Sequence, residues 1–161
     1  MPVNFENNSS FTIANISQYL SLKETDVSKV PEKLKNAEPL RGIGMFGRVG
    51  HAPKGTNTLT WDTSVALLAR GLWDSREYDS FGVGYYANGV SGEFKDAISQ
   101  LTAGTTTVKN EEGVEVFYDF ALTPAIRLIP GYQHIWNPLI AGVAVGQDHA
   151  DLFLARLTLA W

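Results

Sequence analysis

The last eleven residues of the chain, Asp151-Leu-Phe-Leu-Ala-Arg-Leu-Thr-Leu-Ala-Trp161, alternate between two sets of side chains. One set is wholly apolar and consists of Phe153, Ala155, Leu157, Leu159 and Trp161. Successive side chains of a β-strand point to opposite faces of its sheet. The segment therefore predicts a strand that runs to the last residue, with one apolar face that ends in an aromatic side chain.

The same period of two recurs upstream and predicts about seven strands in all. The other six are expected at residues 11–22, 40–51, 58–73, 80–90, 113–122 and 125–136. A slip is expected at Pro130-Gly131, because proline cannot donate to a β-ladder. One short helix is predicted in a loop, at residues 93–101, where Phe94, Ala97, Ile98 and Leu101 have helical spacing. The predicted fold class is thus all-β and antiparallel.

The amino-acid composition excludes several classes of function. The chain has 161 residues, a net charge of −4, no Cys, 15 Gly and 11% aromatic residues, and only 19% of its residues are charged. The absence of a basic stripe argues against a nucleic-acid partner, and the absence of Cys excludes disulfide scaffolds and Cys-based metal sites. The length predicts a single unit over residues 1–161, with residues 1–10 as a polar tail without the apolar core of a signal peptide.

Two kinds of β-structure fit this pattern. A transmembrane strand needs only about 9–11 alternating residues, and membrane barrels carry aromatic girdles at both ends of an apolar band. Four tryptophans fall near expected strand ends and are candidates for such girdles: Trp61, Trp73, Trp136 and Trp161. The alternative is a self-contained soluble β-barrel that binds a small sugar or an apolar ligand. The alternation alone leaves both open.

Three segments resemble the carbohydrate-selective porin family, the OprB family. They are Gly44-Met-Phe-Gly-Arg-Val-Gly50, Phe81-Gly-Val-Gly-Tyr-Tyr-Ala-Asn-Gly-Val-Ser91 and Glu112-Gly-Val-Glu-Val-Phe-Tyr-Asp-Phe-Ala-Leu-Thr-Pro124. The resemblance covers roughly residues 11–161 and only the C-terminal part of the family's barrels of about sixteen strands. It implies a partial antiparallel transmembrane β-barrel. It also implies that the Thr123-Pro124 turn is periplasmic and that residues 91–110 are extracellular. Residues 23–39 would then form an unusually long periplasmic connection.

The resemblance implies a passive diffusion channel for sugars in a bacterial outer membrane. The implied partners are outer-membrane lipid, mono- or oligosaccharide solutes, and the assembly machinery that reads the terminal strand; the oligomeric state is left open. By strand parity, the pore-lining candidates are Arg48, Asp62, Arg70, Tyr86, Asn88, Glu115, Asp119, Arg127 and Arg156.

Patterns typical of enzymes are weak in this chain. Residues 42–47 fit GxGxxG, but Pro53 and Gly55 follow where a dinucleotide site needs a helix. The three His residues lack metal-ligand spacing. Glu115 and Asp119 share a strand face but lie about 13 Å apart along it, which is too far for a glycosidase pair. We therefore predict no catalytic, cofactor-binding or metal-binding residues and no enzyme activity.

Overall fold

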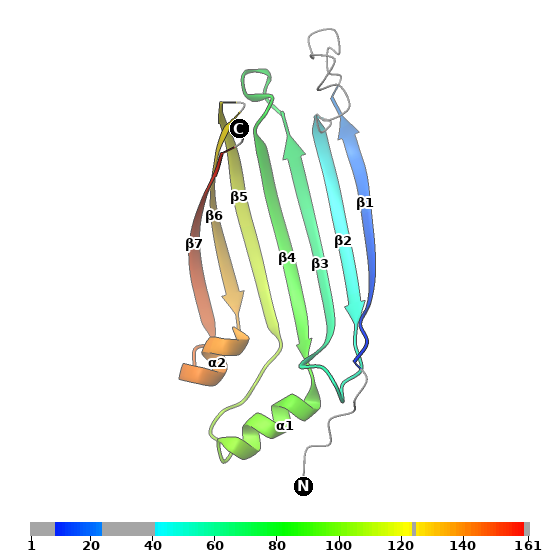
Figure 1. Cartoon of the computed structure of the whole chain (residues 1–161), viewed down its shortest axis with the longest axis vertical. Coiled ribbons are helices and arrows are strands. Elements are labelled where there is room, and N and C mark those ends of the chain that lie inside the picture. Colours follow the sequence, from blue (N-terminus) through cyan, green and yellow to red (C-terminus); the bar gives the residue numbers. More distant parts are fainter. Residues whose placement is uncertain (1–8, 24–40, 124, 160–161) are drawn as a thin grey trace.

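A computed structural model describes residues 9–23, 41–123 and 125–159, and within them the chain forms one antiparallel sheet. Its seven strands are β1 (Thr12–Leu22), β2 (Gly42–His51), β3 (Leu59–Arg70), β4 (Ser80–Val90), β5 (Glu111–Thr123), β6 (Ile126–Trp136) and β7 (His149–Leu159). Each strand pairs with its neighbours in the chain, and the spatial order is β1 to β7 (Figure 1). The sheet is not closed, since β1 and β7 form its two edges. The expected antiparallel all-β fold is confirmed.

The two ends of the sheet differ in the segments that they carry. At one end, which we call the helix end, lie residues 52–58, helix α1 (Gly92–Leu101) and helix α2 (Leu139–Val145) (Figure 1). At the opposite end, the turn end, residues 71–79 include the short 3-10 helix η2 (Asp74–Arg76), and β5 passes almost directly into β6. Residues 24–40, most of the predicted long connection, lie outside the described residues, as do Pro124 and Trp161.

Register divides the side chains into two faces, because residues directly opposite each other on paired strands share a face. One row runs across six strands and contains Met45, Leu67, Val83, Val116, Tyr132 and Phe153. We call the face that holds this row the apolar face. The opposite face, called the polar face, holds the row Arg48, Ser64, Tyr86, Gly113, Ile135 and Ala150.

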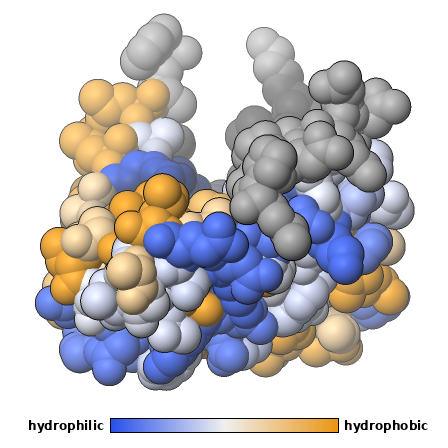
Figure 2. Space-filling view, turned by 90° about the horizontal axis from the view of Figure 1, so that it is seen from below, coloured by the Kyte–Doolittle hydropathy of each residue, from blue (hydrophilic) through white to orange (hydrophobic). Residues whose placement is uncertain are grey.

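No described segment packs on the apolar face, and the described residues enclose almost no core. Their buried hydrophobic residues are Ala52, Ala87, Val90 and Val108. Large apolar side chains are instead exposed; Phe153 is 84% and Leu157 is 60% accessible. Seen from the helix end, hydrophobic residues gather on the left flank, where Figure 1 places α2 and β7, while hydrophilic residues occupy much of the centre (Figure 2). A self-contained soluble barrel would bury its apolar face, so that alternative is not favoured.

Most strand predictions are confirmed, with two corrections. The strand expected at 80–90 has those bounds, but β3 stops at Arg70, and Trp73 lies beyond it at the start of η2. The slip expected at Pro130-Gly131 is wrong. Pairing of β6 with β7 passes through Pro130, and the register of β6 on β5 is the same on both sides of it. Missing one N–H costs a ladder hydrogen bond, and that loss does not shift the strand here.

The helix predicted at 93–101 is confirmed as α1, and it begins where the Ser91 hydroxyl accepts a hydrogen bond from the Phe94 amide at 3.1 Å. The prediction of a single short helix is wrong, because α2 also forms. Pro138 precedes α2, and Gly146 ends it in the left-handed conformation at φ 70°. Among the described residues, no helix is long and apolar enough to cross a membrane.

Candidate pore-lining face

All nine candidate residues predicted from strand parity lie on the polar face. Register places Asp62 opposite Asn88, Tyr86 in the row of Arg48, and Glu115 opposite Gln133. Asp119 shares a row with Arg70, Arg127 lies opposite Ala121 in the next row toward the turn end, and Arg156 lies opposite Ile129. Since these residues come from six different strands, the polar face presents hydrogen-bonding groups and charges of both signs over most of its width.

Near the helix end, Arg48 and Asp62 form an ion pair across β2 and β3. Arg48 Nε lies 3.0 Å from Asp62 Oδ1. The side chain of Asp62 is only 16% exposed, and its carboxylate lies over Gly50, where a methyl group would overlap it. The glycine therefore lets the carboxylate lie flat against the sheet and beside its arginine.

Tyr86 is held in a comparable way on β4. Its ring lies over Gly113 of β5, so closely that a Cβ at that position would overlap the ring. The hydroxyl donates to Glu111 Oε1 at 3.2 Å, and Glu111 Oε2 accepts from the Leu139 amide at 2.8 Å. One carboxylate thus links the polar face to the first turn of α2. Glu111 was not among the predicted residues, since its partner in α2 belongs to a helix that the sequence did not reveal.

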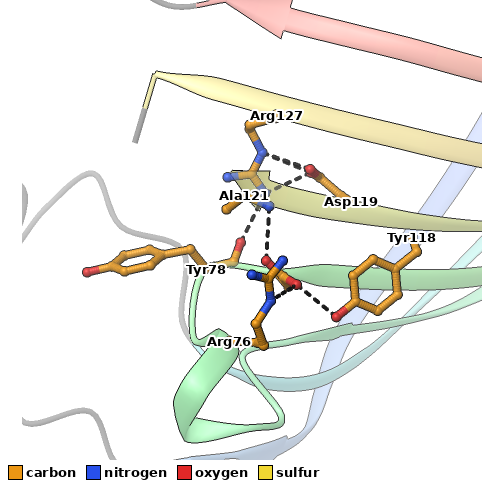
Figure 3. Close-up of polar contacts among 7 residues, drawn as sticks. Arg76, Tyr78, Tyr118, Asp119, Ala121 and Arg127 are labelled. Atoms are coloured by element: carbon orange, nitrogen blue, oxygen red, sulfur yellow. Dashed lines mark hydrogen bonds and ion pairs between the residues drawn. The ribbon is translucent and has the colours of Figure 1, made fainter. Parts of the chain in front are cut away.

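Near the turn end, Asp119 and Arg127 form a two-pronged ion pair across β5 and β6 (Figure 3). Arg127 Nε lies 2.9 Å from Asp119 Oδ1, and Arg127 Nη2 lies 2.8 Å from Asp119 Oδ2. The same Nη2 donates to the Tyr78 carbonyl at 3.0 Å, which fastens the 71–79 segment to the sheet. Such planar pairing is the geometry in which a guanidinium binds a carboxylate most strongly.

The Asp119–Arg127 pair yields a testable coupling. We expect a double-mutant cycle with Asp119→Asn and Arg127→Gln to give an interaction free energy of about 1 kcal/mol, because both side chains are partly exposed. Unfolding of the lipid-inserted protein in denaturant measures it. As a control, Asp119→Asn is combined with Arg48→Gln, which belongs to a separate ion pair. The two losses of stability should then simply add. An equally large interaction free energy in this control would contradict a specific Asp119–Arg127 pair.

Asp79, at the turn end, is a buried carboxylate that the sequence did not single out. It is 4% exposed and accepts hydrogen bonds from Arg76 Nε at 2.7 Å, the Tyr118 hydroxyl at 2.8 Å and the Ala121 amide at 2.9 Å (Figure 3). Burial opposes ionisation, but the Ala121 amide, Tyr118 and Arg76 outweigh it and hold the pKa of Asp79 below its usual value. The charge therefore persists and ties η2 to β5.

Between the two charged regions runs a row that alternates bulky apolar residues with glycine. From β1 to β7 it reads Tyr19, Gly44, Leu68, Gly82, Phe117, Gly131 and Leu154. At Gly82, the Phe117 ring and a methyl group of Leu68 converge over the backbone. An apolar strip thus crosses the middle of this face, and its residues were not predicted because only charged and hydrogen-bonding side chains were expected to line a pore.

Three of the four predicted interface aromatics lie in the described residues. Trp61, near the start of β3, and Trp136, the last residue of β6, lie at the helix end. Trp73 lies at the turn end. All three are exposed. Trp61 belongs to the apolar face, where its indole lies over Gly89. This distribution places tryptophans at both ends of the sheet, and their role as membrane-interface girdles stays a prediction.

The described residues show no group of three or more His, Asp and Glu side chains arranged to hold a metal ion. Glu115 and Asp119 lie in different rows, separated by the row of Phe117, and Asp119 is already paired with Arg127. The arrangement suits contact with a polar solute more than acid–base chemistry on one bond.

Comparison with known proteins agrees with this geometry. The fold is that of a porin-type antiparallel sheet, and it matches the solved structure titled "High pH structure of Pseudomonas putida OprB" with a TM-score of 0.67 and 19% sequence identity. The match covers 90% of this chain and 33% of that chain, so this chain spans about a third of the length of that protein. No curated protein matches the sequence significantly.

Residues 5–147 match the profile of the carbohydrate-selective porin, OprB family. The chain therefore belongs to this family. The resemblance carried by the segments at 44–50, 81–91 and 112–124 is confirmed, and so is the expectation of a porin-type sheet that is open in this chain.

Proposed function

We propose that this chain forms part of the wall of a passive, carbohydrate-selective diffusion channel in a bacterial outer membrane. The observation that carries the proposal is the division of one single-layered sheet into two faces: one is apolar except near the helix end, and the other has paired charges, amides and hydroxyls. Membership of the family supports the same conclusion. The apolar face would contact lipid, and the nine candidate residues would line the pore.

The proposal also fixes an orientation. With the turn end at the periplasm, the connections at that end include the direct passage from β5 to β6, and the longer α1 and α2 connections face outward. Short periplasmic turns and longer extracellular loops are the rule in outer-membrane barrels. The terminal strand, which the resemblance implies is read by the assembly machinery, would then enter from outside and end at the periplasm.

Solute flux into proteoliposomes tests this function. We expect glucose to swell liposomes that contain the protein faster than glutamine does, although glutamine is the smaller solute, because selectivity comes from groups that line the pore. Liposomes without protein provide the baseline. Faster flux of glutamine would contradict carbohydrate selectivity, and a folded monomer that stays in plain buffer without lipid or detergent would contradict the membrane location.

A further inference from the structure

A hollow of about 360 Å³ opens on the polar face toward the turn end, over β2. Its polar-face lining comes from four neighbouring strands and consists of Ser17, Tyr19, Gly42, Gly44, Leu68, Arg70 and Ser80. This volume is within the range of small-molecule sites, about 300–1,000 Å³. The hollow lies apart from both ion pairs of this face.

The hollow exists because no side chain of the described residues covers Gly44. Over Gly82 and Gly113, neighbouring aromatic rings lie against the backbone and leave no room for a methyl group. Over Gly44, a Cβ would meet only the Gln18 carbonyl oxygen at 3.5 Å and Tyr19 Cδ1 at 3.8 Å, which are ordinary contacts. Tyr19 and Leu68 therefore stand on either side of a bare backbone floor as two apolar walls.

The rim of the hollow is polar, and three hydroxyl groups on it are available for hydrogen bonding. The hydroxyls of Ser17, Tyr19 and Ser80 make no hydrogen bond to any other described residue. Arg70 adds a guanidinium to the same rim. Hydroxyl groups both donate and accept, whereas a guanidinium only donates, so the rim matches a ligand whose edge carries several hydroxyls.

We propose that this hollow is a subsite for one pyranose ring of a permeating sugar. A pyranose has C–H groups on its faces, which suit the walls of Tyr19 and Leu68, and hydroxyls around its edge, which suit the rim. Apolar walls with a few converging polar groups are typical of small-ligand sites. The proposal rests on the proposed function, and it names the place on the polar face where the sugar is held.

Gly44→Val tests the subsite, because the new side chain would project into the hollow from its floor, where a Cβ makes only ordinary contacts. The probe is D-glucose, added to the full protein in planar bilayers, where it blocks the ion current while it is bound. We expect the glucose concentration for half-maximal block to rise at least about tenfold, equivalent to 1.4 kcal/mol of lost binding, with nearly unchanged salt conductance. Sorbitol, which has no ring faces, should block the wild-type protein only weakly.

Gly84→Val is the matched control. Gly84 lies on the same face, has similar room for a Cβ, with Ala66 Cβ at 3.4 Å, and does not line the hollow. If both variants shift the glucose block equally, the hollow is not a subsite. Tyr19→Leu, which removes one wall's ring and hydroxyl, should also weaken the block; an unchanged block there overturns the proposal even if Gly44→Val does not fold.

The same recordings separate this proposal from the proposed function. A wild-type channel that passes salt but shows neither glucose block nor glucose flux contradicts carbohydrate selectivity itself. A wild-type channel that glucose blocks, together with a Gly44→Val variant that glucose blocks equally well, overturns only the subsite.

Discussion

Val116→Arg is expected to lower the free energy of unfolding of the lipid-inserted protein by about 2–4 kcal/mol. Val116 is at the centre of the apolar face, in the row that contains Val83, Tyr132 and Phe153. A guanidinium there would face lipid near the middle of the bilayer, where it finds neither water nor a carboxylate. Leu157→Arg, on β7, should give an effect of the same sign, because Leu157 also belongs to the apolar face.

Equilibrium unfolding in guanidinium chloride, with the protein folded in phospholipid bilayers, measures these losses. The control is Gln133→Arg, one residue along β6 from Tyr132 but on the polar face and directly opposite Glu115. We expect that variant to change stability by less than about 1 kcal/mol. Equal losses at Val116 and Gln133 would mean that the two faces were assigned wrongly.

Asp79→Ala is expected to destabilise the protein by about 3 kcal/mol and to change its response to acid. The partly buried Ala121 amide and Tyr118 hydroxyl lose their acceptor, and a polar group left unpaired on full burial costs about 1–3 kcal/mol. Arg76 loses its ion pair as well. Because these contacts fasten the 71–79 segment to β5, the loss should also loosen the turn end.

The acid response follows from the pKa of Asp79, which lies below its usual value. A carboxylate with a lowered folded-state pKa contributes stability that is present above the unfolded value, about 3.9, and is lost as the pH falls toward the folded value. Wild-type stability should therefore fall below about pH 4 more steeply than that of Asp79→Ala. Denaturant unfolding in bilayers at pH 7, 5 and 3 measures the difference.

Asp74→Ala serves as the comparison on the same segment. Asp74 pairs with Lys23 and Arg41, but its side chain is 82% exposed, so solvent screens both pairs. We expect a smaller loss of stability than at Asp79. A loss as large at Asp74 as at Asp79 would show that burial does not set the strength of these contacts.

The faces of the sheet could be predicted from the sequence because alternation is local. Within each strand, parity alone assigns Arg48, Asp119 or Arg156 to a face, and register then aligns those faces. The contacts of Asp79 could not be predicted in this way, since Tyr118 and Ala121 lie 39 and 42 residues further along the chain. Only the register of β4 on β5 brings them together.

The hollow depends on register even more directly. Tyr19 stands opposite Gly44, and the irregularity in pairing between Tyr19 and Ser21 then shifts the rest of β1 along β2. A one-residue displacement would move Tyr19 to the other face. Alternation within one strand does not show which residue of the next strand lies opposite a given side chain. The cavity could therefore not be predicted from the sequence alone.

The order of the strands in the sheet, which repeats their order in the chain, has a kinetic consequence. Every ladder of the described sheet joins segments that are consecutive in sequence, so no pair of strands needs a distant part of the chain to have folded first. Pairing of each new strand closes only the loop that joins it to the preceding strand, and the entropy cost of closing a loop grows slowly with the length of that loop. Assembly of this sheet can thus advance one hairpin at a time, with the backbone groups of each new strand satisfied as it joins.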